Sequence, residues 1–451
     1  MGVNSKLNRL KFSAVQLIVL LYIVIVILAT GLLLLPIAHK PGVELSFIDA
    51  LFTAVSAISV TGLTTVSVTE TFSVTGYFFL LFLLQIGGIG IMTLSSVVWL
   101  VVGKKIGIRE RQMIMADQNR TSLAGLVRLV RDIIILILAI EALGTIVLGT
   151  YFLQYFPSWK EAYLHGLFAS VSATTNGGFD ITGQSLMLFA NDYFVQFINI
   201  ILIILGAIGF PVLVEVKEYL SYKGEGQYKF SLFTKLTASV YFVLLILGMV
   251  GIYFFERNAF FADKAWHESF FYSLFHSTAA RSAGLTTMDL NEFSLPTLLL
   301  LSGLMFIGAS PSSVGGGLRT TTFAIATLSV FYYARGKNTI KIFNKEVHPI
   351  DVHRSFIVVT TAVLIWGVSL ILLVYLEPSL PVLKVIFEIS SAFGTTGSSL
   401  GITSDMSTPG KLVLIVLMFI GRIGLFSLLF LIRGRELKET FNYPKERVLI
   451  G

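Results

Sequence analysis

Four short stretches rich in Ser, Thr, Ala and Gly, each lying between strongly apolar segments, most constrain how this chain can fold. They are FTAVSAISVTGLTT (Phe52–Thr65), FASVSATTNGGFDIT (Phe168–Thr182), FHSTAARSAGLTT (Phe275–Thr287) and FEISSAFGTTGSSL (Phe387–Leu400). Each contains one Gly in a corresponding place, and these glycines are spaced by 116, 106 and 113 residues. Self-similarity at a near-constant period predicts that the chain consists of four copies of one structural unit.

The apolar segments between these stretches indicate a membrane protein. Only 13% of the 451 residues are charged, against about 25% in a soluble domain. Many apolar runs reach about 20 residues, which is enough to cross a bilayer. Cysteine is absent, so disulfides and thiolate metal sites are excluded. The net charge of +7 lies in short loops, which favours membrane orientation over nucleic-acid binding.

Each predicted unit has an apolar span, a short segment and a second apolar span, so the fold class is all-α integral membrane, with four tandem span–pore-loop–span units in a pseudo-fourfold, K⁺-channel-like arrangement. The units are expected at 1–103, 104–220, 221–338 and 339–433, followed by a tail at 434–451. The first spans are expected at Val15–Pro36, Leu129–Leu153, Leu232–Phe255 and Phe356–Leu376. The second spans are expected at Phe78–Val102, Phe194–Val216, Leu295–Tyr333 and Leu412–Ile432, which gives eight full spans. The short segments, such as Ser46–Ser59, are too short to cross and are typical of re-entrant helices.

Most of the 33 Lys and Arg residues lie near the N-terminus, in the loops between units and in the tail. By the positive-inside rule these regions are expected in the cytoplasm, with both termini inside a multi-pass cell-membrane protein. The short segments then enter from the outer face. The basic loops could hold lipid headgroups or dock a partner. The chain has no Rossmann or Walker sequence, so a nucleotide-dependent regulator would be a separate chain.

The loops that follow the short segments are candidates for an ion-selective pore. Non-helical backbone at membrane depth is tolerated where it is buried in protein or lines a water-filled cavity. Four loops around one axis can offer carbonyl oxygens that replace the water shell of a cation, and Gly keeps side chains away from the ion. One such stretch alone would be read as a packing turn, but four copies favour a pore. The expected filter residues are Val60, Thr61, Gly62, Asn176, Gly177, Gly178, Ser282, Ala283, Gly284, Thr395, Thr396 and Gly397.

The fourfold unit, the single filter Gly in each loop and the R-S-A-G-L sequence at Arg281–Leu285 resemble the Trk/Ktr/HKT superfamily of potassium transporters over essentially the whole chain. The first expected span begins at residue 15, which is similar to the shorter Ktr-type membrane subunit. The resemblance implies K⁺ uptake by a homodimer in which each protomer has its own pore and K⁺ binds at filter carbonyls. It also implies Na⁺ dependence, a cytoplasmic nucleotide-binding RCK-type regulatory ring, and no organic cofactor in this chain.

The four loops share only the central Gly, whereas the filter of a K⁺ channel consists of four identical T-V-G-Y-G loops. Because fewer equivalent rings of carbonyl oxygens are then available, we expect one dominant ion site near the glycines.

The second span of the third unit, Leu295–Tyr333, is about twice as long as a crossing needs. It is interrupted at 308–317 by Pro311 and three successive Gly residues, which are poor helix formers. We expect this loop to obstruct the pore below the filter, as the resemblance also implies, and to be the only interrupted span; a packing kink is the alternative. The expected gate residues are Gly308, Ala309, Ser310, Pro311, Ser312, Ser313, Gly315, Gly316 and Gly317.

Two arginines and two aspartates accompany these loops. Arg422, inside the last span, is expected to contact the 308–317 loop and hold it shut, with an ion pair to Glu215 as the alternative. Arg281 is expected behind the third filter loop, bonded to carbonyls or to Glu388. Asp180 and Asp289 are expected on the outer side, either attracting cations or simply solvated. The six His residues show no metal-ligand spacing.

The apolar end Val448–Gly451 is expected to pack against a surface, as at the dimer interface that the resemblance suggests. Two alternatives to a gated K⁺ pore stay open: a secondary cation transporter with alternating access, and a less selective K⁺/Na⁺ channel. The first usually shows inverted repeats, whereas these repeats run in parallel. An intramembrane hydrolase would need paired Asp, or Ser with His, at membrane depth, and no such pair is evident.

Overall fold

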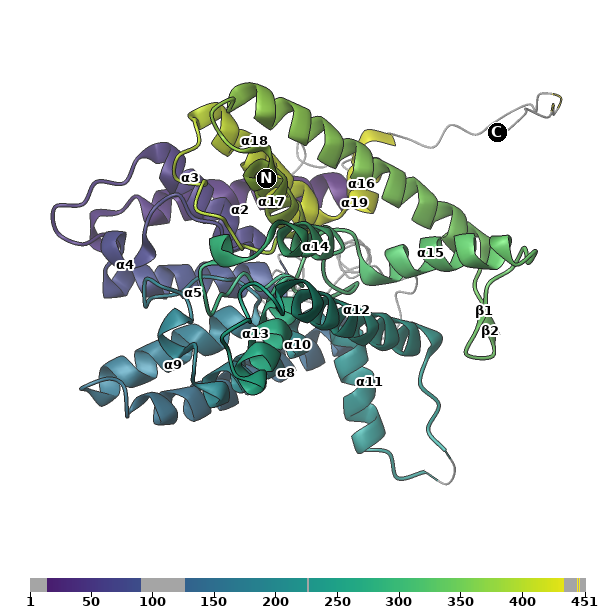
Figure 1. Ribbon diagram of the computed structural model, residues 1–451, viewed down its shortest axis with the longest axis horizontal. Coiled ribbons are helices and arrows are strands. Elements are labelled where there is room, and N and C mark those ends of the chain that lie inside the picture. Colours follow the sequence, from purple (N-terminus) through teal and green to yellow (C-terminus); the bar gives the residue numbers. More distant parts are fainter. Residues whose placement is uncertain (1–13, 91–125, 225–226, 434–443, 445, 447–451) are drawn as a thin grey trace, which may run out of the picture.

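The computed structural model describes residues 14–90, 126–224, 227–433, 444 and 446. The described residues form helices and connecting loops, apart from one short hairpin, so the predicted all-α class is confirmed (Figure 1). The hairpin pairs β1 (Lys341–Ile342) with β2 (Lys345–Glu346) in antiparallel register, Lys341 opposite Glu346. It lies with α15 (Thr320–Ala334) at an end that projects from the helical body (Figure 1).

The same order of helices recurs along the chain. The long first helices are α2 (Ala14–Leu33), α8 (Leu126–Phe152), α12 (Leu232–Glu256) and α16 (Pro349–Leu376). The short helices are α3 (Phe47–Ser59), α9 (Trp159–Thr174), α13 (Trp266–Ala279) and α17 (Val382–Gly394). The second helices are α5 (Val74–Ile89), α10 (Tyr193–Ala207), α14 (Leu295–Phe306) and α18 (Thr408–Ile423). Short connections add α4 (Val68–Thr71), η1 (Pro36–Ala38), η2 (Met187–Phe189) and η3 (Leu290–Glu292).

Local signals set the ends of the short helices. The Ser46 hydroxyl accepts a hydrogen bond from the Asp49 amide, and Ser158 accepts one from Glu161, so α3 and α9 begin with N-caps. In α13 the carboxylate of Glu268 instead accepts from the Ala265 amide at 2.8 Å. The left-handed residues Val60 and Thr395 end α3 and α17. Helices α9 and α13 end at right-handed residues instead, Thr175 and Ala280.

The long first helices have the length and surface of membrane spans. Among the described residues, α2, α8, α12 and α16 are long and apolar enough to cross a membrane, or up to six spans exist if each bent pair of helices counts as one. Their outward faces carry exposed apolar side chains, for example Ile27, Leu143, Leu247 and Leu364. Such a surface suits lipid rather than water. The second half of the predicted span Phe78–Val102 lies outside the described residues.

The expectation that only the third unit has an interrupted span is wrong. Helix α10 is followed by α11 (Phe210–Leu220) at a bend of 103°, and α18 by α19 (Leu425–Arg433) at a bend of 99°. The breaks fall at Gly209 (φ 103°, ψ 126°) and Gly424 (φ 87°, ψ 142°), a conformation that L-residues rarely adopt. Gly90, which ends α5, has nearly the same backbone (φ 90°, ψ 134°). A single Gly is therefore enough to turn the chain in the second and fourth units.

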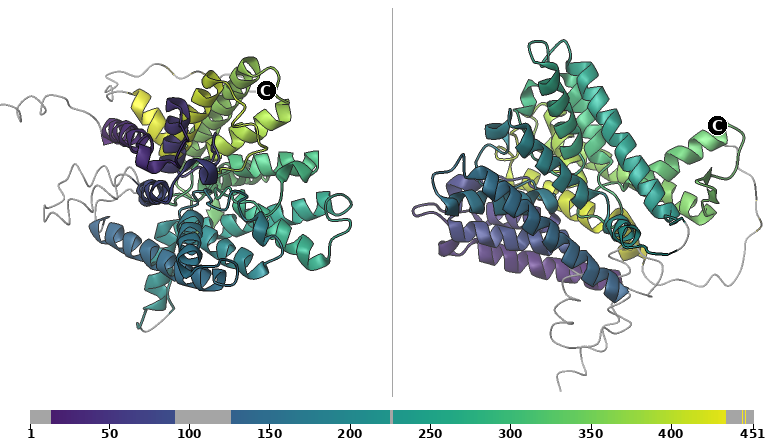
Figure 2. Two further views of the ribbon diagram at one scale, coloured as in Figure 1. Left: turned by 90° about the vertical axis from the view of Figure 1, so that its left-hand side faces the viewer. Right: turned by 90° about the horizontal axis from the view of Figure 1, so that it is seen from below.

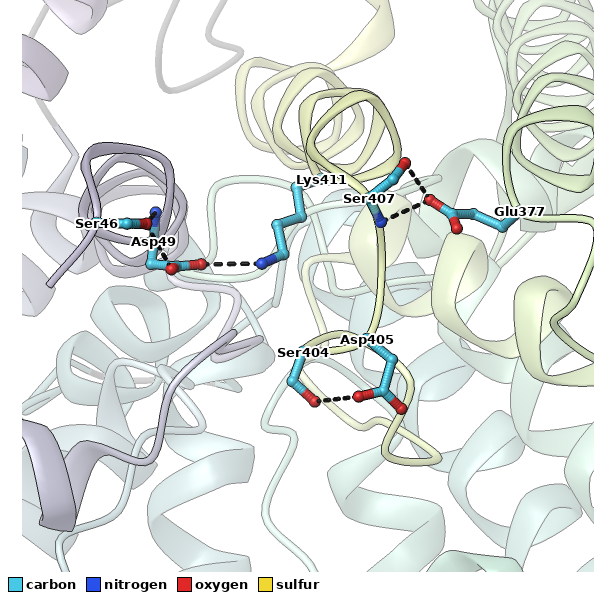
Figure 3. A network of polar contacts seen from close by, with 7 residues as sticks. All are labelled: Ser46, Asp49, Glu377, Ser404, Asp405, Ser407 and Lys411. Atoms are coloured by element: carbon cyan, nitrogen blue, oxygen red, sulfur yellow. Dashed lines mark hydrogen bonds and ion pairs between the residues drawn. The ribbon is translucent and has the colours of Figure 1, made fainter.

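The first and last units lie side by side, so the four units close on themselves (Figure 2). The rings of Tyr22 on α2 and Phe419 on α18 are 4.9 Å apart in an edge contact. At the amino ends of α3 and α18, the Lys411 ammonium lies 3.0 Å from the Asp49 carboxylate (Figure 3). The Glu377 carboxylate at the end of α16 accepts from the Ser407 amide at 2.8 Å, which joins the two spans of the fourth unit.

Candidate functional site

The four predicted filter loops have a common backbone. The residue two positions before each filter Gly has positive φ: Val60 (56°), Asn176 (53°), Ser282 (124°) and Thr395 (49°). The glycines also have positive φ: Gly62 (93°), Gly178 (67°), Gly284 (63°) and Gly397 (95°). The four loops therefore share the same positive-φ pattern, and at the filter position Gly adopts this backbone without the steric cost that a side chain would bring.

Each filter glycine packs against the backbone of the next loop. A methyl group placed on any of the four would lie closer than 3.0 Å to the carbonyl oxygen just before the neighbouring filter Gly. The pairs are Gly62 with Gly177, Gly178 with Ala283, Gly284 with Thr396, and Gly397 with Thr61. The contacts run from the first loop through the second, third and fourth and back to the first. The loops therefore close a ring in chain order.

Hydroxyl groups six residues before the filter glycines support three of the loops, a feature that the sequence analysis missed. Ser56 and Ser391 each accept from the amide of their filter Gly at 3.0 Å. Ser172 donates to the Phe179 carbonyl at 2.6 Å. Thr278 occupies the same position in the third copy but donates to Leu274 of its own helix. The recurring Ser or Thr was visible in the aligned stretches.

The third loop departs from the others at its base. The amide of the residue before the filter Gly bonds to the carbonyl five residues earlier in the other units, as in Thr61 to Ser56. In the third, Ala283 bonds to Ala279, four residues earlier. This stretch is one residue shorter, which accounts for the tighter turn and the unusual φ of Ser282. The Ser282 hydroxyl then reaches the fourth loop and donates to the Thr395 carbonyl at 2.9 Å.

The residues predicted as a gate, 308–317, form a buried loop between α14 and α15. The Gly316 amide donates to the hydroxyl of the filter residue Thr395 at 2.7 Å, so the loop lies directly against the ring. On one side the Ser310 amide bonds to the Ala207 carbonyl at 3.2 Å, at the break of the second unit. On the other side the Gly317 amide bonds to the Gly421 carbonyl at 3.2 Å, at the end of α18.

Arg422 contacts this loop. Its guanidinium donates to the carbonyl oxygen of Val314 in the loop and to that of Gly87 at the end of α5. Glu215, the alternative partner, accepts from the Ser231 amide at 2.6 Å and its hydroxyl at 2.8 Å. Arg422 thereby links three units through backbone carbonyls.

Arg319, just after the loop, donates to the carbonyls of Ser310 and Gly315 and closes the loop on itself.

The expectation that Arg281 bonds to carbonyls or to Glu388 is wrong. Its side chain is fully buried behind the third filter loop, and no described residue provides a hydrogen-bond partner for its Nε, Nη1 or Nη2. Its guanidinium lies 5.5 Å from the centre of the Tyr241 ring on α12. Glu388 accepts instead from the hydroxyls of Ser399 and Thr403.

The two aspartates expected on the outer side organise their own loops. The Asp180 carboxylate accepts from the amides of Thr182, Gly183 and Ser185 at 2.8–3.1 Å. Asp289 is exposed and caps the short helix η3 through the Asn291 amide.

Comparison with known proteins agrees with this geometry. The family model described as TrkH, cation transport protein, matches residues 8–438. The chain is 54% identical to Ktr system potassium uptake protein D of Bacillus subtilis, over 98% of this chain and 100% of that protein. It is 32% identical to potassium/sodium uptake protein NtpJ of Enterococcus hirae, over the full length of both. The solved structure of the potassium transporter TrkH from Vibrio parahaemolyticus has the same fold, with a TM-score of 0.73, 20% identity and coverage of 94% of this chain and 86% of that one.

Proposed function

The chain belongs to the TrkH family of cation transport proteins, and from that premise we propose that it is the K⁺-conducting membrane subunit of a potassium uptake system. It is then a transport protein and not an enzyme. Relatives named as potassium uptake proteins over their whole length support K⁺ as the transported ion. The observation that carries the proposal is the closed ring of four loops, in which each filter Gly packs on the next loop.

The ring is suited to a dehydrated monovalent cation. Carbonyl oxygens of the twelve predicted filter residues are the ligands that can replace the water shell of K⁺. The four short helices end at the ring, so their partial negative charges add to the attraction. Because the four loops have the same residue only at the central Gly, the four glycines Gly62, Gly178, Gly284 and Gly397 define one dominant site rather than a row of equal sites.

The 308–317 loop is the gate of this pathway. Its burial against Thr395, α10 and α18 supports a plug directly beneath the ring. Arg422 holds the plug in place, because its bond to Val314 exists only while the loop lies in this position. Apart from Pro311 and Val314 the loop consists of Gly, Ala and Ser, so its withdrawal removes few large side chains from their packing.

Further parts of the proposal concern orientation and partners. Both termini and the basic loops between units lie in the cytoplasm, a face suited to a nucleotide-binding RCK-type ring and to anionic lipid. The name of a relative, Ktr system, supports a separate regulatory subunit, and that of NtpJ supports a role for Na⁺, activating or co-transported. The chain acts as a homodimer. Most of the basic loop at 104–128 and the end Val448–Gly451 lie outside the described residues.

Uptake of ⁸⁶Rb⁺ into liposomes that contain this chain alone tests the proposal. We expect ⁸⁶Rb⁺ uptake driven by a K⁺ gradient. Excess K⁺ outside should block this uptake, whereas an equal concentration of Na⁺ should not. Block by both ions to the same extent would identify a less selective K⁺/Na⁺ channel. Uptake that requires a substrate on the opposite side would point to alternating access. Adding Na⁺ inside or outside separately distinguishes activation from co-transport.

A further inference from the structure

We propose that Arg281 is a positioning residue that favours withdrawal of the 308–317 loop, and so opposes Arg422. This inference rests on the proposed gate and adds a second, opposite control of it. The two arginines approach the loop from different units and have opposite surroundings. Arg422 donates to carbonyls of the loop and of α5 in the present arrangement. Arg281 has no such partner among the described residues.

Arg281 belongs to the third unit alone. The residues three positions before the filter Gly in the other units are small: Ser59, Thr175 and Gly394. Ser59 and Thr175 satisfy their hydroxyls within their own loop or helix. The guanidinium at this position is therefore specific to the unit that also contains the gate loop. It is not part of the backbone pattern that the four units share.

The surroundings of Arg281 leave its charge uncompensated. The side chain is 0% exposed. The contact with the Tyr241 ring, at 5.5 Å, is a cation–π interaction that offsets part of the cost of burial. Tyr241 and Thr237, one turn apart on α12, also have hydroxyls without a hydrogen-bond partner among the described residues. Three polar side chains thus lie together behind the third filter loop with donors that no described acceptor uses.

This cluster adjoins the gate loop on two sides. Ser282, the neighbour of Arg281, has its hydroxyl closer than 3.0 Å to where a methyl group on Gly315 would lie. Tyr241 packs in one hydrophobic cluster with Ala309 of the loop and with Ala207 and Ile208 of the second unit. The backbone carbonyls of residues 308–317 are therefore the acceptors that a small displacement of the loop can bring to the guanidinium.

The energetic consequence has a definite sign. An uncompensated buried charge raises the energy of the conformation that contains it. Moving the loop so that its carbonyls accept from Arg281 lowers that energy, whereas the same movement breaks the Arg422–Val314 bond. Removing the charge at residue 281 stabilises the present, obstructing arrangement. Removing the charge at residue 422 does the reverse.

The test measures ⁸⁶Rb⁺ uptake into liposomes by Arg281→Gln, Arg281→Lys and Arg422→Gln. We expect Arg281→Gln to lower uptake at least about fivefold, the lower end of typical coupling between sites, Arg281→Lys to lower it less, and Arg422→Gln to raise it. Arg257→Gln is the matched control, because Arg257 also lies over an aromatic ring, that of Phe254, but is exposed. It should leave uptake unchanged.

A second background separates the gate from other effects. In a chain that lacks residues 310–316, Arg281→Gln should have no further effect, because the loop through which it acts is gone. An equal change in both backgrounds would mean that Arg281 acts on the ion through its charge, and would overturn the inference. If the deletion itself does not raise uptake, the proposed gate fails. If the deletion raises uptake while Arg281→Gln changes nothing in the full chain, only the role of Arg281 fails.

A readout independent of flux uses the absence of cysteine from the chain. A single Ser313→Cys substitution places one thiol in the loop, and its rate of reaction with a water-soluble thiol reagent reports withdrawal. We expect Arg281→Gln to slow this reaction and Arg422→Gln to accelerate it, in protein whose elution volume and melting temperature match those of Ser313→Cys alone. Equal rates in the three proteins would overturn the inference.

Discussion

The ring of filter loops and the second helices beneath it follow opposite rules. In the ring, all four units present positive φ at the same two positions, and each glycine contacts the next loop. Beneath the ring, the second helix of the first, second and fourth units ends at one Gly: Gly90, Gly209 and Gly424. In the third unit, the buried loop 308–317 stands in this place. An ion on the axis needs ligands from every side, so the ring must stay regular. Obstruction needs only one part that moves.

We expect the largest effect from a substitution that breaks the regularity of the ring. Gly397→Ser places a side chain at φ 95° and against the Thr61 carbonyl. Left-handed backbone costs a non-Gly residue about 1–3 kcal/mol, and the clash adds to it. We expect ⁸⁶Rb⁺ uptake to fall about a hundredfold, with residual uptake that discriminates less between K⁺ and Na⁺. Gly303→Ala on α14, where a methyl group meets nothing within 4 Å, is the control. Unchanged kinetics in all four single filter variants would contradict the filter assignment.

Removing the loop that distinguishes the third unit should have the next largest effect. Deleting residues 310–316 takes away the hydrogen bonds to Thr395 and Ala207 but none of the four filter loops. We expect uptake to rise about tenfold with K⁺ selectivity retained. Competition by K⁺ and Na⁺ measures selectivity in the same liposomes. A large loss of uptake in a deletion variant that elutes and melts like the parent would argue against a gate.

Weakening the hold on the loop should have a smaller effect than removing the loop. Arg422→Gln loses the charge that donates to Val314 and Gly87. We expect uptake to rise about threefold, because the other hydrogen bonds of the loop remain. Arg422→Lys keeps the charge but cannot reach both carbonyls with a planar fork, and should be intermediate. A fall in uptake, with normal folding, would show that Arg422 supports the open pathway instead.

The smallest effect concerns the boundary between first and last units. Burial raises the pKa of Asp49, but the hydrogen bond from Ser46 and the charge of Lys411 outweigh it, so the pKa lies below its usual range. Such a carboxylate stabilises the fold above its unfolded pKa, and this is lost as pH falls through the folded pKa. We expect Asp49→Asn to cost about 0.5 kcal/mol near neutral pH and nothing in strong acid.

Thermal unfolding over a pH series measures this contribution of the Asp49 carboxylate to stability. Asp405→Asn is the control for Asp49→Asn, since Asp405 is exposed and bonds only its neighbour Ser404 among the pairs drawn in Figure 3. A destabilisation of Asp49→Asn that does not change with pH would assign the effect to packing.

Much of this architecture follows from local sequence. Four Gly-containing stretches after short apolar helices predict four re-entrant loops, and Pro311 with three successive glycines predicts the break in the third unit. The turns at Gly209 and Gly424 escaped prediction because a lone Gly inside an apolar helix is usually tolerated. Their signal is the repeated Gly-x-x-Gly, as in Gly206–Gly209 and Gly421–Gly424. The surroundings of Arg281 depend on how α12 packs, which no local pattern encodes.

Among the described residues, only the third unit has a buried loop of this kind, and this has a consequence for how such a chain can arise and change. Four separate, identical subunits would each carry any new insertion, and the space under the ring is already filled by one loop that touches α10 on one side and α18 on the other. Joining the copies in a single polypeptide after duplication removes that constraint. One copy can then acquire an obstructing loop while the other three keep the geometry that the ion requires. Random mutagenesis should accordingly find substitutions that raise uptake concentrated in the third copy, whereas substitutions that reduce selectivity should occur at the filter glycines of all four copies.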